Sequence, residues 1–198
     1  MDEKRSIVKY SVPESAITRK AIFSVVNKPA IRALKKAGKD LAERGIAAGS
    51  RGSLSARVDG GFIVTATGAK LGDLSDDDFV VVSGFDLERH ALLKAEGLKE
   101  PSSEAQLHAR LYSILPAMNV VVHVHDPQLM GEKAAEKLKL PITAGGHEHG
   151  TKDAADAACA LLADGGTAAI MKDHGIVAVA HKLEDAVEKL TVLHRRAP

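Results

Sequence analysis

The stretch Val120-Val121-Val122-His123-Val124-His125 decides the architecture and carries the sharpest chemical feature of the chain. A run of β-branched residues of this length predicts a buried strand over Asn119–His125. Because side chains alternate faces along a strand, the valines at 120, 122 and 124 share one side, and His123 and His125 project together on the other. Two imidazoles at i and i+2 could coordinate one metal ion. The alternative interpretation is two polar residues on the wet face of a sheet.

The chain on both sides of this strand predicts helices and further strands around it. Before the strand we expect a helix that starts at Pro29 and ends at Gly49, followed by the strands Ser53–Val58 and Phe62–Thr67, which the turn Asp59-Gly60-Gly61 joins. A strand Phe79–Ser83 and an irregular stretch 86–100 come next. A second helix is opened by residues 101–104 and ends at Pro116, and its buried side consists of Leu107, Leu111, Ile114 and Leu115. After it we expect a helix 128–139, a short strand Pro141–Ala144, a Gly/His loop 145–150, a helix 152–163, strands Thr167–Met171 and Ile176–Ala180, and a helix 183–195. This order predicts a three-layer α/β/α sandwich, in which helices flank a mainly antiparallel central sheet.

The length of 198 residues predicts one domain with a sizeable core. Residues 1–24 show no clear hydrophobic period, so we interpret them as an N-terminal arm without assigned chemistry. The single domain is then expected over residues 25–198.

Composition argues against several classes of function. A formal net charge of +1 and an aromatic content of 3%, with no Trp, disfavour nucleic-acid binding. The longest apolar run, Ala157–Ala163, is too short for a membrane span, and the N-terminus leads into no secretory segment, so a cytoplasmic protein is expected. A lone cysteine, Cys159, allows no internal disulfide and no CxxC zinc site, so a bound metal would need His or carboxylate ligands.

Other candidate residues lie at turns and at a helix start. His174, in a turn between two β-rich runs, is a possible third metal ligand, although a turn histidine before glycine is usually just exposed. Glu104 and His108 share one helix face at i and i+4 and could serve acid/base chemistry, although a surface pair would look identical. Phosphate could be bound by backbone N–H groups near Gly52-Ser53, Thr67-Gly68 and Ser102-Ser103, each of which also fits an ordinary turn or helix cap.

Five motifs in one order make these features more specific. They are Gly52-Ser53-Leu54-Ser55-Ala56-Arg57, Thr65-Ala66-Thr67-Gly68, Ser102-Ser103-Glu104, Val121-Val122-His123-Val124-His125 and His174-Gly175-Ile176. On these motifs the sequence resembles the class II aldolase/adducin family over roughly residues 30–195.

The resemblance implies a metal-dependent aldehyde-lyase of carbohydrate metabolism. It assigns His123, His125 and His174 as ligands of Zn²⁺ or another divalent metal, and Glu104 as the acid/base group, for which we expect a raised pKa. It assigns phosphate binding to Gly52, Ser53, Thr67, Gly68, Ser102 and Ser103. The implied reaction cleaves a phosphorylated keto-sugar, such as fuculose-1-phosphate, into dihydroxyacetone phosphate and an aldehyde through an enediolate. The family also implies a homo-oligomer, typically a tetramer.

The sequence departs from the family pattern at three places. Ser53 stands where the family has Asn, which puts phosphate binding in question. The segment between Leu140 and Gly150 is shorter than in the fuculose-phosphate aldolases of the family, and the chain ends at Pro198 before their tyrosine-bearing tail. We therefore expect His147-Glu148-His149 either to be a polar loop over the pocket or to supply, through His149 or Glu148, the missing proton donor.

Within the family, three alternatives to aldol cleavage are considered. Glu104 disfavours the epimerases, which carry Asp at this position as a further metal ligand. A dehydratase acting on methylthioribulose-1-phosphate stays open, because it would use the same metal, enediolate and carboxylate. A non-catalytic, adducin-like interaction module is disfavoured because all three ligand positions hold His.

Overall fold

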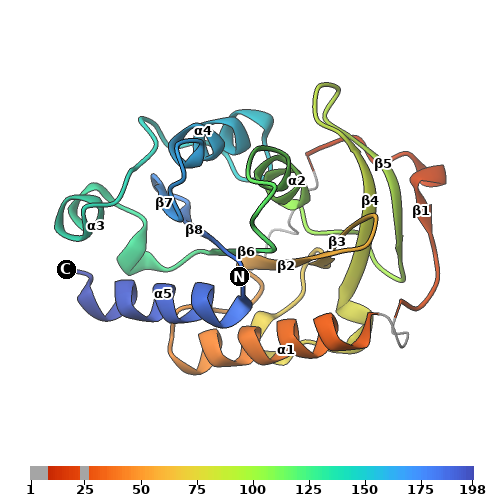
Figure 1. The fold of residues 1–198 in the computed structure, drawn as a ribbon, viewed down its shortest axis with the longest axis horizontal. Helices are drawn as coiled ribbons and strands as arrows, with labels where there is room; N and C mark the ends of the chain where they lie inside the picture. Colours follow the sequence, from red (N-terminus) through yellow and green to blue (C-terminus); the bar gives the residue numbers. More distant parts are fainter. Residues whose placement is uncertain (1–8, 23–26) are drawn as a thin grey trace, which may run out of the picture.

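A computed structural model describes residues 9–22 and 27–198. The protein has one central sheet (Figure 1). Among these residues the sheet has eight strands in the order β1-β5-β4-β3-β2-β6-β8-β7. The strands are β1 (Ile17–Thr18), β2 (Gly52–Val58), β3 (Gly61–Thr65), β4 (Phe79–Asp86), β5 (Ala91–Gly97), β6 (Val120–Val124), β7 (Ala168–Met171) and β8 (Gly175–Ala180). The β1–β5 pair is parallel, and the other neighbouring pairs are antiparallel.

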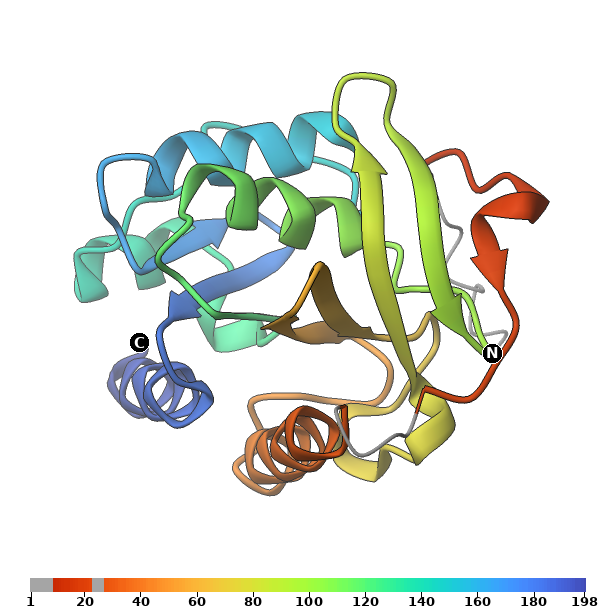
Figure 2. The same ribbon diagram turned by 45° about the vertical axis from the view of Figure 1, so that its right-hand side comes forward.

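Helices cover both faces of this sheet, as Figures 1 and 2 show. On one face lie α1 (Lys28–Glu43) and α5 (Leu183–Arg196), and on the other lie α2 (Ala105–Ile114) and α4 (Lys152–Leu162). The short helix α3 (Glu132–Leu138) lies beyond the β7 side of the sheet. Each face has its own apolar cluster: the valines at 120, 122 and 124 belong to the α1–α5 side, and Val121 to the α2–α4 side. The predicted three-layer sandwich with a mainly antiparallel sheet is confirmed.

The first long helix ends earlier than we predicted. It stops at Glu43, and the exit is made by Gly45, whose φ is +76°, rather than by Gly49. The N–H of Gly45 donates to the carbonyl of Ala42, and that of Ile46 to the carbonyl of Leu41, so the last turn closes in a Schellman motif. Ile46, predicted as a helical core residue, is buried in the turn that follows the helix.

The expectation of an irregular stretch over 86–100 is wrong, because strand β5 occupies its centre. Leu92 and Ala95 are buried against the α2–α4 layer, whereas Leu93 is 59% exposed. Irregularities in the β4–β5 register around Gly84 interrupt the alternation expected of a regular strand. Pairing with β4 on one side and β1 on the other stabilises a segment whose own residues favour helix.

Three smaller expectations also need correction. Ile114, predicted in the buried stripe of α2, is 41% exposed, and the buried positions are instead filled partly by polar side chains of the same helix. The helix predicted over 128–139 is split into a short 3-10 turn, Pro127–Leu129, and α3. The strand predicted over Pro141–Ala144 is reduced to one isolated bridge between Ile142 and Ile170.

The part of the predicted arm that the structure describes packs on the sheet. Ser11 forms a parallel bridge with Ala91, and β1 pairs with β5 further along. Residues 1–8 and 23–24 of the predicted arm lie outside the described residues. The division into an arm over 1–24 and a single domain over 25–198 stays a prediction. No helix in the described parts of the chain combines the length and the hydropathy needed to cross a bilayer.

Strand β6 is held between two backbones that come unusually close to it. A Cβ atom on Gly175 would lie 2.4 Å from the carbonyl oxygen of Val124 and 3.2 Å from Cε1 of His123. On the other side, a Cβ on Gly52 would lie 2.6 Å from the carbonyl oxygen of His123, and Gly52 has a φ of +124°. These two glycines allow β2 and β8 to flank the first histidine of the His-x-His pair.

We predict that Gly175→Ala lowers the free energy of unfolding by about 2–3 kcal/mol, because the added methyl group collides with a backbone oxygen that strand pairing holds in place. Gly145→Ala is the matched control, since nothing lies within 4 Å of a Cβ at that position. Urea denaturation of both variants checks the prediction. Equal stability of the two variants would show that β6 and β8 do not pack as described.

Candidate metal centre

Two sheet elements bring three histidines together at one end of the sheet. His123 lies in β6 and His125 directly follows it, while His174 lies in the three-residue loop Lys172-Asp173-His174 between β7 and β8. In that loop Asp173 adopts a left-handed φ of 58°, which is tolerated by Asp. The loop is anchored by a hydrogen bond from the Asp173 N–H to the carbonyl of Met130.

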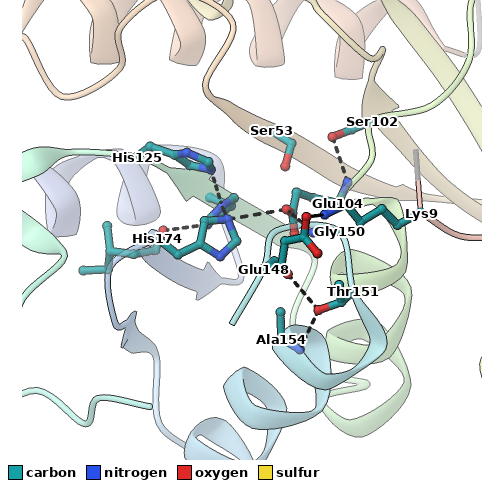
Figure 3. Close-up of polar contacts among 12 residues, drawn as sticks. Lys9, Ser53, Ser102, Glu104, His125, Glu148, Gly150, Thr151, Ala154 and His174 are labelled. Carbon is teal, nitrogen blue, oxygen red and sulfur yellow. Dashed lines mark hydrogen bonds and ion pairs between the residues drawn. The ribbon is translucent and has the colours of Figure 1, made fainter. Parts of the chain in front are cut away.

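The three imidazoles converge on one point (Figure 3). The Nε2 atom of His123 lies 2.9 Å from Nε2 of His125 and 3.3 Å from Nε2 of His174. One ligand nitrogen from each residue fits within 4.8 Å of the others, so the group could hold a metal ion. Tetrahedral nitrogen ligands at ~2.0–2.1 Å from zinc are separated by about 3.3 Å. The arrangement therefore fits an ion of that size.

Protonation of the histidines also suits a metal. Nδ1 of His123 lies 3.1 Å from the carbonyl oxygen of Ile176, which places the ring proton on Nδ1 and leaves the Nε2 lone pair directed to the centre. Burial, together with the neighbouring imidazoles, lowers the pKa of His123 well below its usual value, and burial and His174 lower that of His125 to about 4. Both rings are therefore neutral near pH 7, the form that coordinates metals.

Glu104, at the N-cap of α2, faces these imidazoles. Its Oε1 lies 3.5 Å from Nε2 of His174 and accepts a hydrogen bond of 2.8 Å from the N–H of Gly150. Burial alone would raise the pKa of this carboxyl group, but the hydrogen bond to His174 and the positive charges that His123, His174 and His125 carry when protonated at low pH outweigh burial and lower the pKa to about 2. The expected rise in pKa is thus not found here, and the carboxylate is ionised.

The six predicted phosphate binders lie on three neighbouring segments. Gly52 and Ser53 begin β2, Thr67 and Gly68 follow β3, and Ser102 and Ser103 precede α2. The structure connects the last two segments, because the Thr67 hydroxyl donates to the carbonyl of Pro101 and the Thr67 N–H to that of Glu100. Ser53 is fully buried, and Ser102 and Ser103 are 6% and 5% exposed. Their surroundings are polar, but they are covered in this structure.

His108 does not form a surface pair with Glu104. It is fully buried, with Nε2 2.8 Å from the Ser53 hydroxyl and Nδ1 2.6 Å from the Ser55 hydroxyl. The Ser55 hydroxyl also lies 2.8 Å from the hydroxyl of Tyr112. Burial lowers the pKa of His108 to about 4, so it joins β2 to α2 as a neutral group. The predicted Glu104–His108 acid/base pair is wrong, because both ring nitrogens of His108 are engaged elsewhere.

The loop 145–150 closes over the centre, as the sequence led us to expect. The ring of His149 lies 6.2 Å from that of His174, and the Gly150 N–H reaches Glu104. A hollow of about 340 Å³ opens beside the centre, and its lining consists of Arg51, His125, Met130, His147, Glu148, His149, Asp173 and His174. Sequence reasoning did not single out Arg51 or Met130. No local signal distinguishes Arg51 from other exposed turn residues.

The remaining histidines, His90, His181 and His194, carry no motif in the sequence and were expected to be solvated. His181 is exposed, whereas His90 and His194 are partly buried, and Nδ1 of His194 lies 2.6 Å from Oδ2 of Asp126. Asp126 also accepts from the N–H of Gln128 and is 1% exposed. The His194–Asp126 contact therefore connects α5 to the residue that directly follows His125.

The fold and the centre together define a class: an α/β sandwich that presents three imidazoles and one carboxylate at the end of an antiparallel sheet. Residues 32–198 match the family described as Class II Aldolase and Adducin N-terminal domain. This match covers most of the sequence, and the chain belongs to that family.

Named relatives show a spread of activities. A methylthioribulose-1-phosphate dehydratase of Pseudoalteromonas translucida is 35% identical over 99 residues, which cover 50% of this chain and 44% of the relative. An L-fuculose phosphate aldolase of Methanococcus maripaludis is 29% identical over 170 residues, 79% of this chain and 88% of the relative. The crystal structure of L-fuculose-1-phosphate aldolase from Thermus thermophilus shares the fold, with a TM-score of 0.65 and 23% identity over 84% of this chain and 89% of that one. The matched part of the dehydratase is less than half of its length.

We predict that His123→Ala, His125→Ala and His174→Ala each reduce the divalent metal content from about one ion per chain to less than 0.1, since two imidazoles hold an ion far more weakly than three. His181→Ala, in an exposed position, should retain the full content. Elemental analysis after metal loading and desalting checks this. Fewer than about 0.3 ions per chain in the unsubstituted protein would contradict the site and favour an interaction module.

Proposed function

We propose that this chain is a zinc-dependent lyase that cleaves a phosphorylated keto-sugar, such as fuculose-1-phosphate, into dihydroxyacetone phosphate and an aldehyde. The observation that carries the proposal is the placement of the ionised Glu104 carboxylate 3.5 Å from His174, within the same buried cluster as the other two imidazoles. His123, His125 and His174 would hold the ion, and three protein ligands leave positions for substrate oxygens. When bound, a divalent ion polarises a carbonyl group and stabilises the negative charge that develops on adjacent oxygens.

The protein's own groups would position and transfer the protons. The hydrogen bond from Gly150 fixes the Glu104 carboxylate toward the imidazoles. In the condensation direction the ionised carboxylate would take a proton from the carbon of dihydroxyacetone phosphate that forms the new bond, and in the cleavage direction the resulting carboxyl group would return that proton to the same carbon. Cleavage also removes a proton from the hydroxyl group on the aldehyde fragment. We assign this transfer to His149, which lines the open side of the centre and would return the proton in the condensation direction.

Phosphate recognition would come from the segments that carry the predicted binders. Ser102 and Ser103 precede the N-terminus of α2, where backbone N–H groups and the helix dipole favour an anion. Gly52 and Ser53, with Thr67 and Gly68, lie on the segments beside them. The role of Ser53 would be indirect in this arrangement, since its hydroxyl group contacts His108.

A second candidate is a dehydratase that acts on methylthioribulose-1-phosphate. The 35% identity to such an enzyme over half of this chain favours it. Both reactions require an enediolate and a carboxylate acid/base, so the centre serves either. An assay of the zinc-loaded protein against fuculose-1-phosphate, rhamnulose-1-phosphate, ribulose-1-phosphate and methylthioribulose-1-phosphate separates them. Release of dihydroxyacetone phosphate or glycolaldehyde phosphate supports aldol cleavage, and water loss without either product supports the dehydratase.

We also propose that the chain forms a homotetramer, as the family resemblance implies, and that it acts in the cytoplasm, as its sequence led us to expect. Sedimentation of the purified protein tests the assembly. A monomer that is fully active would contradict the tetramer as a functional requirement.

We predict that Glu104→Gln lowers kcat at least ~100-fold, because the amide cannot transfer a proton, while the metal content is unchanged. His149→Ala should lower kcat by ~10-fold or more if this side chain transfers the second proton. His181→Ala, on the exposed surface, is the control for both. Steady-state kinetics on the substrate identified above gives the values. Full turnover of His149→Ala alongside an inactive Glu104→Gln would refute the assignment to His149 and keep that to Glu104.

A further inference from the structure

The N-terminal arm is fixed to the backbone that leads into the phosphate segment. The hydroxyl group of Tyr10 lies 3.1 Å from the carbonyl oxygen of Ser102 and 3.3 Å from that of Pro101. The Tyr10 ring packs edge-on against Phe85, at 5.1 Å between centroids, and Tyr10 is only 4% exposed. Ser11 is held on both sides, since its N–H donates to the carbonyl of His90 and its carbonyl accepts from Leu92. The arm therefore has a defined position at the start of α2.

This anchoring places the preceding residue, Lys9, at the candidate site. In the view of Figure 3, Lys9 is drawn on the side of the site that holds Ser102 and Glu104. Its ammonium nitrogen is buried, and it forms an ion pair with the carboxylate of Glu148 in the loop 145–150. The Glu148 side chain is 71% exposed, whereas that of Lys9 is 19% exposed. The ammonium group of Lys9 is therefore buried in the protein, whereas the carboxylate of Glu148 lies at the surface.

A positive charge beside the predicted phosphate binders would strengthen the binding of a phosphate dianion. The six predicted phosphate binders, listed above, have no cationic side chain. Neutral N–H and O–H donors bind an anion less strongly than donors that carry a charge. The ammonium group of Lys9 could add such a charge, because Lys9 directly precedes Tyr10, whose hydroxyl group contacts the carbonyl oxygen of Ser102.

The loop 145–150, which Lys9 contacts through Glu148, also packs over Ser103, one of the predicted phosphate binders. A Cβ on Gly150 would lie 3.1 Å from the carbonyl oxygen of Ser103, so the end of the loop packs directly on that residue. When Glu148 loses its ion pair with Lys9, one contact that holds the loop in this covering position is lost. Because Glu148 is exposed, water can solvate its carboxylate after the exchange.

We propose that Lys9 is a substrate-binding residue whose ammonium group exchanges Glu148 for the phosphate group of the sugar, so that the arm determines specificity for phosphorylated substrates. This inference rests on the proposed function, because it takes a phosphorylated sugar as the ligand. It predicts that Lys9 and Glu148 have opposite effects on anion affinity. A Lys9 that only pins the loop through Glu148 would instead give both residues the same effect.

The test measures the binding of inorganic phosphate to zinc-loaded protein by isothermal titration calorimetry, with acetohydroxamate as a probe that binds the metal alone. We expect Lys9→Met to weaken phosphate binding at least 10-fold and to leave acetohydroxamate binding within 2-fold. Lys9→Arg should restore most of the phosphate affinity, and Glu148→Gln should strengthen it or leave it unchanged. Thermal unfolding of each variant verifies that the fold is retained.

Equal weakening by Lys9→Met and Glu148→Gln, or no change with Lys9→Met, would overturn the inference. On an active substrate, Lys9→Met should raise KM at least 10-fold and change kcat less than 3-fold. Absence of lyase activity on every sugar phosphate would refute the proposed function but leave the phosphate titration interpretable. Failure of the two proposals is therefore distinguishable.

Discussion

The structure depends on the convergence of three imidazole nitrogens and one carboxylate in a buried place. Neutral imidazoles whose lone pairs point at one another are unfavourable unless a proton or a cation lies between them. Nε2 of His123 and Nε2 of His125 are nevertheless 2.9 Å apart, with the Glu104 carboxylate behind His174. A cation bound between these nitrogens would accept their lone pairs together. The glycines on both sides of β6 let the neighbouring backbones approach His123, which bears the first of the three imidazoles, and Val124, which adjoins it.

Segments distant in sequence complete the centre from different directions. The hairpin between β7 and β8 supplies His174, the N-cap of α2 supplies Glu104, and the loop 145–150 closes over both. The described part of the arm lies against the same helix start through Tyr10. Lys9 and Arg51 provide positive charge close to the acidic groups of the site.

Local pattern was sufficient where the residue types alternate regularly along the chain. The alternation of Val and His over 120–125 predicted that two imidazoles share one face, and the structure brings their Nε2 atoms together. Strand β5 was missed because its register is irregular and its stability comes from pairing with β4 and β1. His108 was wrongly paired with Glu104, because the helical period of α2 does not show that Ser53 and Ser55 lie opposite His108 on strand β2. Lys9 had no signal at all, since its position is set by an anchor one residue away and by a loop far along the chain. Of the site residues, the structure places the histidine triad and Glu104 together, while their chemical roles stay predictions.

X-ray absorption at the zinc edge of the zinc-loaded protein tests the central claim most directly, because it counts the imidazoles around the ion. The account predicts three imidazole nitrogens at ~2.0–2.1 Å, with oxygen in the remaining coordination positions. A spectrum with two or fewer imidazoles, or with a sulfur ligand at ~2.3 Å, would contradict it.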